Sequence, residues 1–221
     1  MPRADYQRQL DALRADVVEM GDDVLARYED ALAVLETRDA DDARTVIEGD
    51  DEINERYLAL EGDCIGLFAL QQPVAGDLRF IASTFKILTD LERVADLATN
   101  LAAYAVEVER DRYSEVDVRH VGERTAAMVE DALAAYRDAD ADTARDIAAR
   151  DDDVDRLCET ASRTVIEDLL RTDYGDDAAA RLEDASRLLL MIRDLERVGD
   201  HAVNVCARIV YMAEHDAALL Y

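Results

Sequence analysis

An internal repeat with an offset of 101 residues is the feature that most constrains the fold of this chain. The offset places the segment EDALA at 29–33 on the identical segment at 130–134. After an insertion of three residues the offset becomes 104, which places DLERVAD at 90–96 on DLERVGD at 194–200. Such self-similarity indicates a duplicated structural unit. We therefore expect two copies of one fold.

Each copy is predicted to contain three helices. An Asp-rich break at 39–42 recurs at 138–142, and the break Gln71-Gln72-Pro73 is matched by 172–177 around Gly175. Between these breaks run long stretches of Ala, Leu, Asp, Glu and Arg without a strand signal, as is typical of helices. The expected helices lie near residues 4–36, 41–70, 74–109, 115–137, 141–171 and 177–214. Asp residues at the Asp-rich breaks are expected to cap helix starts, and Pro73 to sit in a first turn.

The fold class expected is all-α, with two tandem three-helix bundles of spectrin-repeat-like helices related by an internal pseudo-twofold. The first bundle is expected at 1–110 and the second at 111–221. The polar connection at 111–115 is short and lacks a flexible linker composition, so the two halves should pack into one body. Helical spacing in the third helix also predicts one core stripe: Ile87, Leu91, Val94, Ala98, Leu101 and Ala105.

The charge balance excludes several kinds of partner. Asp and Glu number 52 against 25 Lys and Arg, giving a formal net charge of −27, and Lys86 is the only lysine. A surface of this sign repels nucleic acid and anionic bilayers, and no basic cluster offsets it. The same composition is typical of halophilic proteins, whose self-repulsion concentrated salt screens.

Cysteine usage and hydropathy indicate a cytoplasmic protein. Cys64, Cys158 and Cys206 are odd in number, form no Cys-x-x-Cys pair, and lie among apolar residues. They are expected to be small buried side chains and not ligands. No N-terminal signal is evident, and no apolar run reaches the ~18 residues that a membrane-spanning helix needs, so direct membrane insertion is not expected.

Two ladders of oxygen-bearing side chains are the candidate functional residues. They are Glu92, Asp96 and Asn100 in the third helix, and Glu196, Asp200 and Asn204 in the sixth. A spacing of four stacks successive side chains on one helix face. The stacked carboxylates repel each other, and Arg93 and Arg197 are expected to project about 100° away around the helix. A bound cation would remove that repulsion.

The second and fifth helices add further oxygen donors, Asp50 with Asn54 and Asp151 with Asp155. Oxygen-only ligand sets suit Mg, Ca, Mn or iron, and the absence of His and Cys argues against a structural zinc. A lone Glu-x-x-x-Asp on an acidic helix is usually a solvated face, but its recurrence in both copies favours metal binding. His120, His201 and His215 have no second ligand at helical spacing and are expected to be packing or surface residues.

No catalytic constellation is visible. The sequence holds no nucleophile with its base, no glycine-rich phosphate loop and no dinucleotide fingerprint. A ferritin-like di-iron enzyme would need Glu-x-x-His on two helices, and no Glu is followed by His at that spacing. We therefore expect a protein that is not an enzyme.

The chain resembles the PhoU family over almost its entire length. The segments that carry the resemblance are ALQQPVAGDLR at 69–79, DLERVAD at 90–96, and LERVGDH at 195–201 followed by Asn204. The resemblance implies a pair of three-helix bundles that acts as a cytoplasmic accessory of a phosphate ABC transporter. Negative control of phosphate uptake and of phosphate-starvation genes is the implied function. Together with the acidic composition, it predicts a member from a halophilic archaeon.

The resemblance also implies partners and a metal motif. The ATPase subunit of the transporter is the expected partner, a sensor histidine kinase stays open as a second, and a homodimer is expected. The family motif maps onto Glu92 with Asp96 and Glu196 with Asp200, and with less support onto Asp50 and Asp151. The metal is expected to be divalent or trivalent, with Fe, Mn, Mg and Zn left open. The alternative function is a metal-binding structural or storage protein without a transport role.

Overall fold

A computed structural model describes residues 3–70, 74–107, 116–171 and 175–220, and within these ranges the chain is helical without a strand. The helices are α1 (Arg3–Thr37), α2 (Ala40–Glu48), α3 (Asp50–Leu70), α4 (Ala75–Glu107), α5 (Val118–Asp138), α6 (Ala141–Ala148), α7 (Asp151–Arg171) and α8 (Ala178–Glu214), with short 3-10 helices η1 (Gly175–Asp177) and η2 (Ala218–Leu220). The expected all-α class is confirmed. No helix of the described ranges is long and apolar enough to cross a bilayer.

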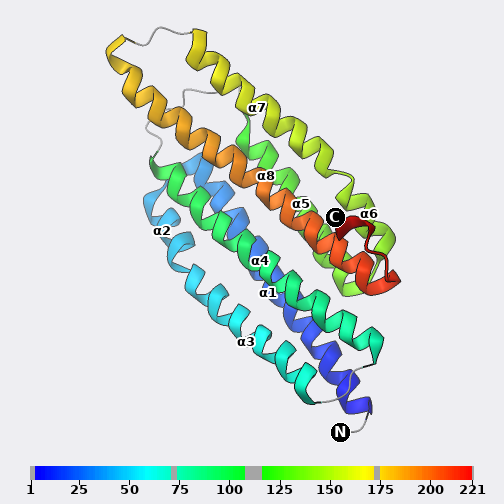
Figure 1. The fold of residues 1–221 in the computed structure, drawn as a ribbon. Coiled ribbons are helices and arrows are strands. Elements are labelled where there is room, and N and C mark those ends of the chain that lie inside the picture. The colour runs from blue at the N-terminus through cyan, green and yellow to red at the C-terminus, as the bar shows by residue number, and fades with distance from the viewer. Residues whose placement is uncertain (1–2, 71–73, 108–115, 172–174, 221) are drawn as a thin grey trace.

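The middle of an elongated body is formed by α1, α4, α5 and α8, and it is flanked by α2 and α3 on one side and by α6 and α7 on the other (Figure 1). Helix α4 packs on α8, and α1 packs on α5, so both contacts join the two copies. In the first copy α2 and α3 pack on α1 and α4, while in the second α6 and α7 pack on α5 and α8. Each of these packing contacts of the flanking helices in one copy has its counterpart in the other, as a pseudo-twofold requires. The expected boundary at 110/111 lies outside the described residues.

Two reciprocal glycine–leucine contacts hold α1 close to α5. A methyl group at Gly21 would overlap the side chain of Leu133, and one at Gly122 would overlap that of Leu32. The offset of 101 relates both pairs. The two helices approach closely here because neither glycine carries a side chain.

The predicted core stripe of the third helix is buried throughout. All six of its residues are at most 2% exposed. Cys64, Cys158 and Cys206 are also buried, and all three are free thiols. Burial raises the pKa of each thiol to about 12, so none is a thiolate near neutral pH.

Each middle helix of the expected triplets is divided in two. The break falls at Gly49 in the first copy and at residues 149–150 in the second. The acidic runs 50–52 and 151–153 follow the breaks and occupy the first turns of α3 and α7. Carboxylates are favoured there because the helix dipole is positive at its N-terminus. Asp50 and Asp151 therefore begin new helices and do not lie in the middle of longer ones.

The predicted Asp caps are found at the starts of α2 and α6. The Asp39 carboxylate accepts hydrogen bonds from the backbone N–H groups of residues 41 and 42, at 2.8 and 3.2 Å, to start α2. The Asp140 carboxylate accepts from those of residues 142 and 143, at 3.1 and 3.0 Å, to start α6. The same device thus begins the same helix in both copies. The break at 71–73, with the expected first-turn Pro73, lies outside the described residues.

Candidate metal centre

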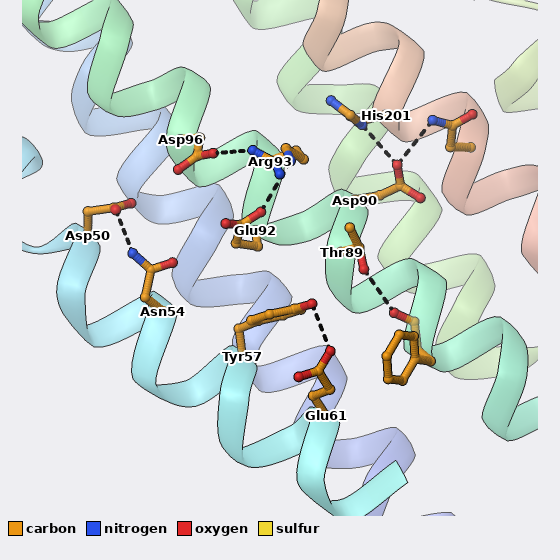
Figure 2. A network of polar contacts seen from close by, with 12 residues as sticks. Asp50, Asn54, Tyr57, Glu61, Thr89, Asp90, Glu92, Arg93, Asp96 and His201 are labelled. Atoms are coloured by element: carbon orange, nitrogen blue, oxygen red, sulfur yellow. Dashed lines mark hydrogen bonds and ion pairs between the residues drawn. The ribbon is translucent and has the colours of Figure 1, made fainter. Parts of the chain in front are cut away.

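In the first copy, α3 brings Asp50 and Asn54 beside Glu92 and Asp96 of α4 (Figure 2). The Asn54 side-chain amide donates to Asp50 Oδ2 at 2.8 Å. Partial burial raises the pKa of Glu92, and repulsion from Asp96 and Asp50 adds to the effect. These side chains therefore form one group, although the sequence pattern identified them on the two helices separately. We call it the first carboxylate group, and it consists of Asp50, Asn54, Glu92 and Asp96.

Arg93 lies closer to the first carboxylate group than its helical position suggests. Its Nη1 is 2.9 Å from Asp96 Oδ2, and its Nε is 3.5 Å from Glu92 Oε2. The arginine side chain is long enough to fold back over the helix surface, so the expected projection away from both carboxylates is wrong. A positive charge already stands between Glu92 and Asp96 (Figure 2).

In the second copy, Asp151 and Asp155 of α7 face Glu196 and Asp200 of α8. Burial raises the pKa of Asp151 to about 6, and repulsion from Asp155 and Asp200 contributes. The pKa values of Glu196 and Asp200 are also raised, first by burial and then by Asp155. These four side chains are close enough to repel one another, and we call them the second carboxylate group.

Arg197 does not repeat the arrangement of Arg93. Its Nη1 lies 4.0 Å from Oδ1 of the fully buried Asp194. Arg193 contacts the same oxygen at 2.8 Å. The charge of Arg197 still lowers the pKa of Asp200 slightly against the larger effects that raise it. The second carboxylate group therefore keeps more uncompensated negative charge than the first.

One oxygen in each group is buried without a hydrogen-bond partner. These atoms are Oδ1 of Asp50 and Oδ1 of Asp151, at positions that the repeat relates. A Cβ built on Gly199 would lie 3.0 Å from the Asp151 atom, so the missing side chain at Gly199 lets that carboxylate lie against α8. A buried, unpaired carboxylate oxygen is costly and suits a cation. On this observation the residues fit a hard metal ion.

In the described part of the chain, neither carboxylate group is arranged as a ready-made metal site. No three His, Cys, Asp or Glu side chains there are arranged so that they could hold a metal ion as they stand. Mutual repulsion keeps like charges apart when no cation lies between them. Binding would therefore require these side chains to rotate inward from the two facing helices.

The third members of the ladders lie away from the first two. Asn204 donates to Asp90 Oδ1 at 3.0 Å, and His201 Nδ1 lies 2.9 Å from the same oxygen. Asn204 thus joins α8 to α4, on the side where Figure 2 places His201 and Asp90. Each four-residue step advances about 40° beyond a full turn, so two steps rotate a side chain by about 80°. The same rotation separates Asn100 from Glu92.

The sequence predicted that Cys158 is buried, but not that it lies beside the second carboxylate group. Cys158 is buried beneath the second group, since all four carboxylates contribute to raising its pKa after burial itself. The equivalent residue of the first copy is Tyr57, whose hydroxyl donates to Glu61 at 3.1 Å. The offset of 101 could have shown this difference, because it aligns residue 57 with residue 158.

Comparisons with known proteins agree with this architecture. The model of the PhoU domain matches twice, at residues 17–105 and 118–209. A phosphate-specific transport system accessory protein PhoU homolog from Pseudomonas putida is 34% identical over 94% of this chain and 80% of its own length. The PhoU accessory protein of Escherichia coli is 29% identical, over 93% of this chain and 84% of its own.

Solved structures show the same fold. The crystal structure of PhoU from Pseudomonas aeruginosa is 31% identical, with a TM-score of 0.88 over 96% of this chain and 100% of its own. The PhoU regulatory protein from Streptococcus pneumoniae is 27% identical and also gives a TM-score of 0.88, over 96% and 99%. With its duplicated helical unit matched twice by the family model, this chain belongs to the PhoU family.

Proposed function

We propose that the protein is a regulatory accessory of a phosphate-specific transport system and restrains phosphate uptake when phosphate is plentiful. The observation that carries the proposal is the similarity to proteins named as accessories of such systems, along more than nine-tenths of the chain and with one shared fold. Binding to a partner, and not catalysis, is the proposed activity.

The proposed partner is the ATPase subunit of the transporter, on the cytoplasmic side of the membrane. Three buried free thiols are consistent with a reducing compartment. The two carboxylate groups are proposed to bind divalent or trivalent cations. A bound cation would remove repulsion between α3 and α4 and between α7 and α8, and would hold each pair of helices together.

Deletion of the gene in its source strain tests the regulatory role. Uptake of labelled phosphate in phosphate-replete medium should rise several-fold and return to normal on complementation. Affinity capture of the tagged protein from the same cells should recover the transporter ATPase. Unchanged uptake after deletion would contradict the proposal.

The second candidate function is that of a metal-binding structural or storage protein. The two carboxylate groups, each with a buried unpaired oxygen, favour it independently of any transporter. The two functions differ in the deletion strain. Loss of a storage protein would lower the metal content of the cells and leave phosphate uptake unchanged.

A further inference from the structure

The two carboxylate groups are related by the repeat but are chemically unequal. At the position where the second group has Asp155, the first has Asn54. The first group thus offers three carboxylates and one amide, whereas the second offers four carboxylates. For hard cations, the number of charged ligands is a main determinant of affinity.

The first group is also partly neutralised by its own neighbours. Arg93 contacts both Glu92 and Asp96, and the Asn54 amide donates to Asp50 (Figure 2). Because Arg93 is half-exposed, this ion pair is weak and a cation can displace it. Because the cation must first displace Arg93 from Glu92 and Asp96, the first group binds the cation less tightly than its three carboxylates alone would.

The second group has no such internal counter-ion. Among the described residues, no Arg or Lys forms an ion pair with Asp151, Asp155, Glu196 or Asp200. Arg124 and Arg156 contact the neighbouring Asp153, and Arg197 turns to Asp194. Within the described residues, no ion pair therefore offsets the repulsion in the second group, which a bound cation would relieve.

We propose that the second carboxylate group binds a hard divalent cation first, on the order of tenfold more tightly than the first group, in which Arg93 serves as a resident counter-ion. The inference rests on the proposed cation binding and adds an order of loading to it. The two copies then respond over different ranges of cation concentration. Occupancy of the first group requires Arg93 to move away from Glu92 and Asp96.

Manganese uptake by the chelator-stripped full chain tests the order. Equilibrium dialysis against Mn²⁺ in about 1 M KCl, where non-specific attraction is screened, should show two steps separated about tenfold in concentration. Glu196→Gln with Asp200→Asn should remove the tighter step, and Glu92→Gln with Asp96→Asn the weaker one. Circular dichroism at the same salt concentration confirms that each variant is folded.

A matched control removes two carboxylates elsewhere. Asp22→Asn with Glu29→Gln takes two exposed side chains of α1 and should leave both steps in place. Loss of a step in this control as well as in the group variants would mean that the net charge and not the groups binds Mn²⁺, which would overturn the proposal.

Exchanging the distinguishing residues gives the decisive comparison. Asn54→Asp with Arg93→Gln should tighten the weaker step about tenfold, so that the two steps merge. Asp155→Asn should weaken the tighter step by a similar factor. Two equal steps in the wild-type protein, or loss of the tighter step on changing Glu92 and Asp96, would overturn the order of loading while leaving cation binding intact. No Mn²⁺ uptake by the wild-type protein would overturn both.

Discussion

Asp50 and Asp151 occupy equivalent first-turn positions in α3 and α7, and each holds a carboxylate oxygen buried without a hydrogen-bond partner. A structural cap would use that oxygen on a backbone N–H group, as Asp39 and Asp140 do. The same unsatisfied atom occurs in both copies of the repeat, and this is the observation that supports the proposed cation binding. At the residue scale, the proposed cation binding therefore depends on Oδ1 of Asp50 and Oδ1 of Asp151, which belong to the two carboxylate groups.

The first prediction concerns Asp151 and pH. Its pKa is about 6 in the folded protein, against about 4 for an ordinary Asp, so between these values the folded state keeps a proton that the unfolded chain has lost. The contribution of Asp151 to the free energy of unfolding should therefore fall as pH rises from about 4 to about 6, and should stay lower above pH 6. In metal-free protein at pH 7, Asp151→Asn should raise the free energy of unfolding by on the order of 1 kcal/mol, after allowance for solvent screening.

Urea denaturation of chelator-treated protein between pH 5 and 7 measures this gain, which should shrink towards the acid end. Asp152→Asn is the matched control, since it removes one charge from the exposed neighbouring residue and should change stability by less than about 0.5 kcal/mol. Equal effects of the two substitutions at pH 7 would count against a special environment for Asp151.

Which helix faces carry the candidate ligands could be predicted from the spacing, because a period of four identifies neighbours on one helix. The grouping of Asp50 with Glu92, and of Asp151 with Glu196, is in the structure. The contacts of Arg93 and Asn204 could not be predicted in this way. The rotamer of a long side chain such as Arg93 depends on all the charges around it. For Asn204, the rotation of about 40° that each four-residue step adds accumulates along the helix.

At the element scale, the copies share the division of the middle helix and the close approach of α1 to α5. The division was missed because Gly49 and Ala149–Arg150 are weak break signals, and helical propensity continues on both sides. The acidic runs that follow could equally lie on a solvated face. The packing of both parts of each divided helix on the same two helices is visible only in the structure.

The second prediction tests the reciprocal contacts between α1 and α5. Gly21→Ala should force the Leu133 side chain to move, and Gly122→Ala should do the same to Leu32. Overpacking costs about 1–3 kcal/mol, against a gain of up to about 1 kcal/mol in helix propensity, so each variant should lose roughly 1–2 kcal/mol. Chemical denaturation should give similar losses for the two, because the repeat relates them.

Gly62→Ala provides the control for helix propensity. A Cβ at Gly62, on the exposed side of α3, meets nothing within 4 Å, so this variant should gain up to about 1 kcal/mol. Combining Gly21→Ala with Leu133→Ala should cost less than the two single changes together, by at least about 0.5 kcal/mol. Strict additivity would show that the glycine and the leucine do not contact each other in solution.

At the scale of the whole molecule, duplication explains the architecture, and the net charge predicts that stability depends on the salt concentration. The repeat predicted two similar units, and the structure pairs their helices in equivalent contacts. Solved structures at 31% and 27% identity share this fold, so the topology tolerates extensive changes of sequence. The acidic excess therefore concerns solubility and stability and says nothing about the function of the two groups.

The last prediction is that stability rises with salt. Many Arg side chains pair with nearby carboxylates, and salt weakens these attractions as well as the repulsions, but exposed pairs contribute little. The net charge of −27 leaves a large excess of carboxylates without a counter-charge, so relief of repulsion should dominate. Raising KCl from 0.1 to 1 M shortens the Debye length from ~10 to ~3 Å. The melting temperature of chelator-treated protein should then increase, by roughly 2–4 °C for each kcal/mol of repulsion screened.

KCl is preferred to sulfate, which strengthens apolar burial in any protein. The Asp22→Asn, Glu29→Gln variant, with less charge to screen, should show a smaller increase. A melting temperature that is the same at both salt concentrations would show that the acidic surface does not limit stability, and would remove the physical basis for a halophilic adaptation.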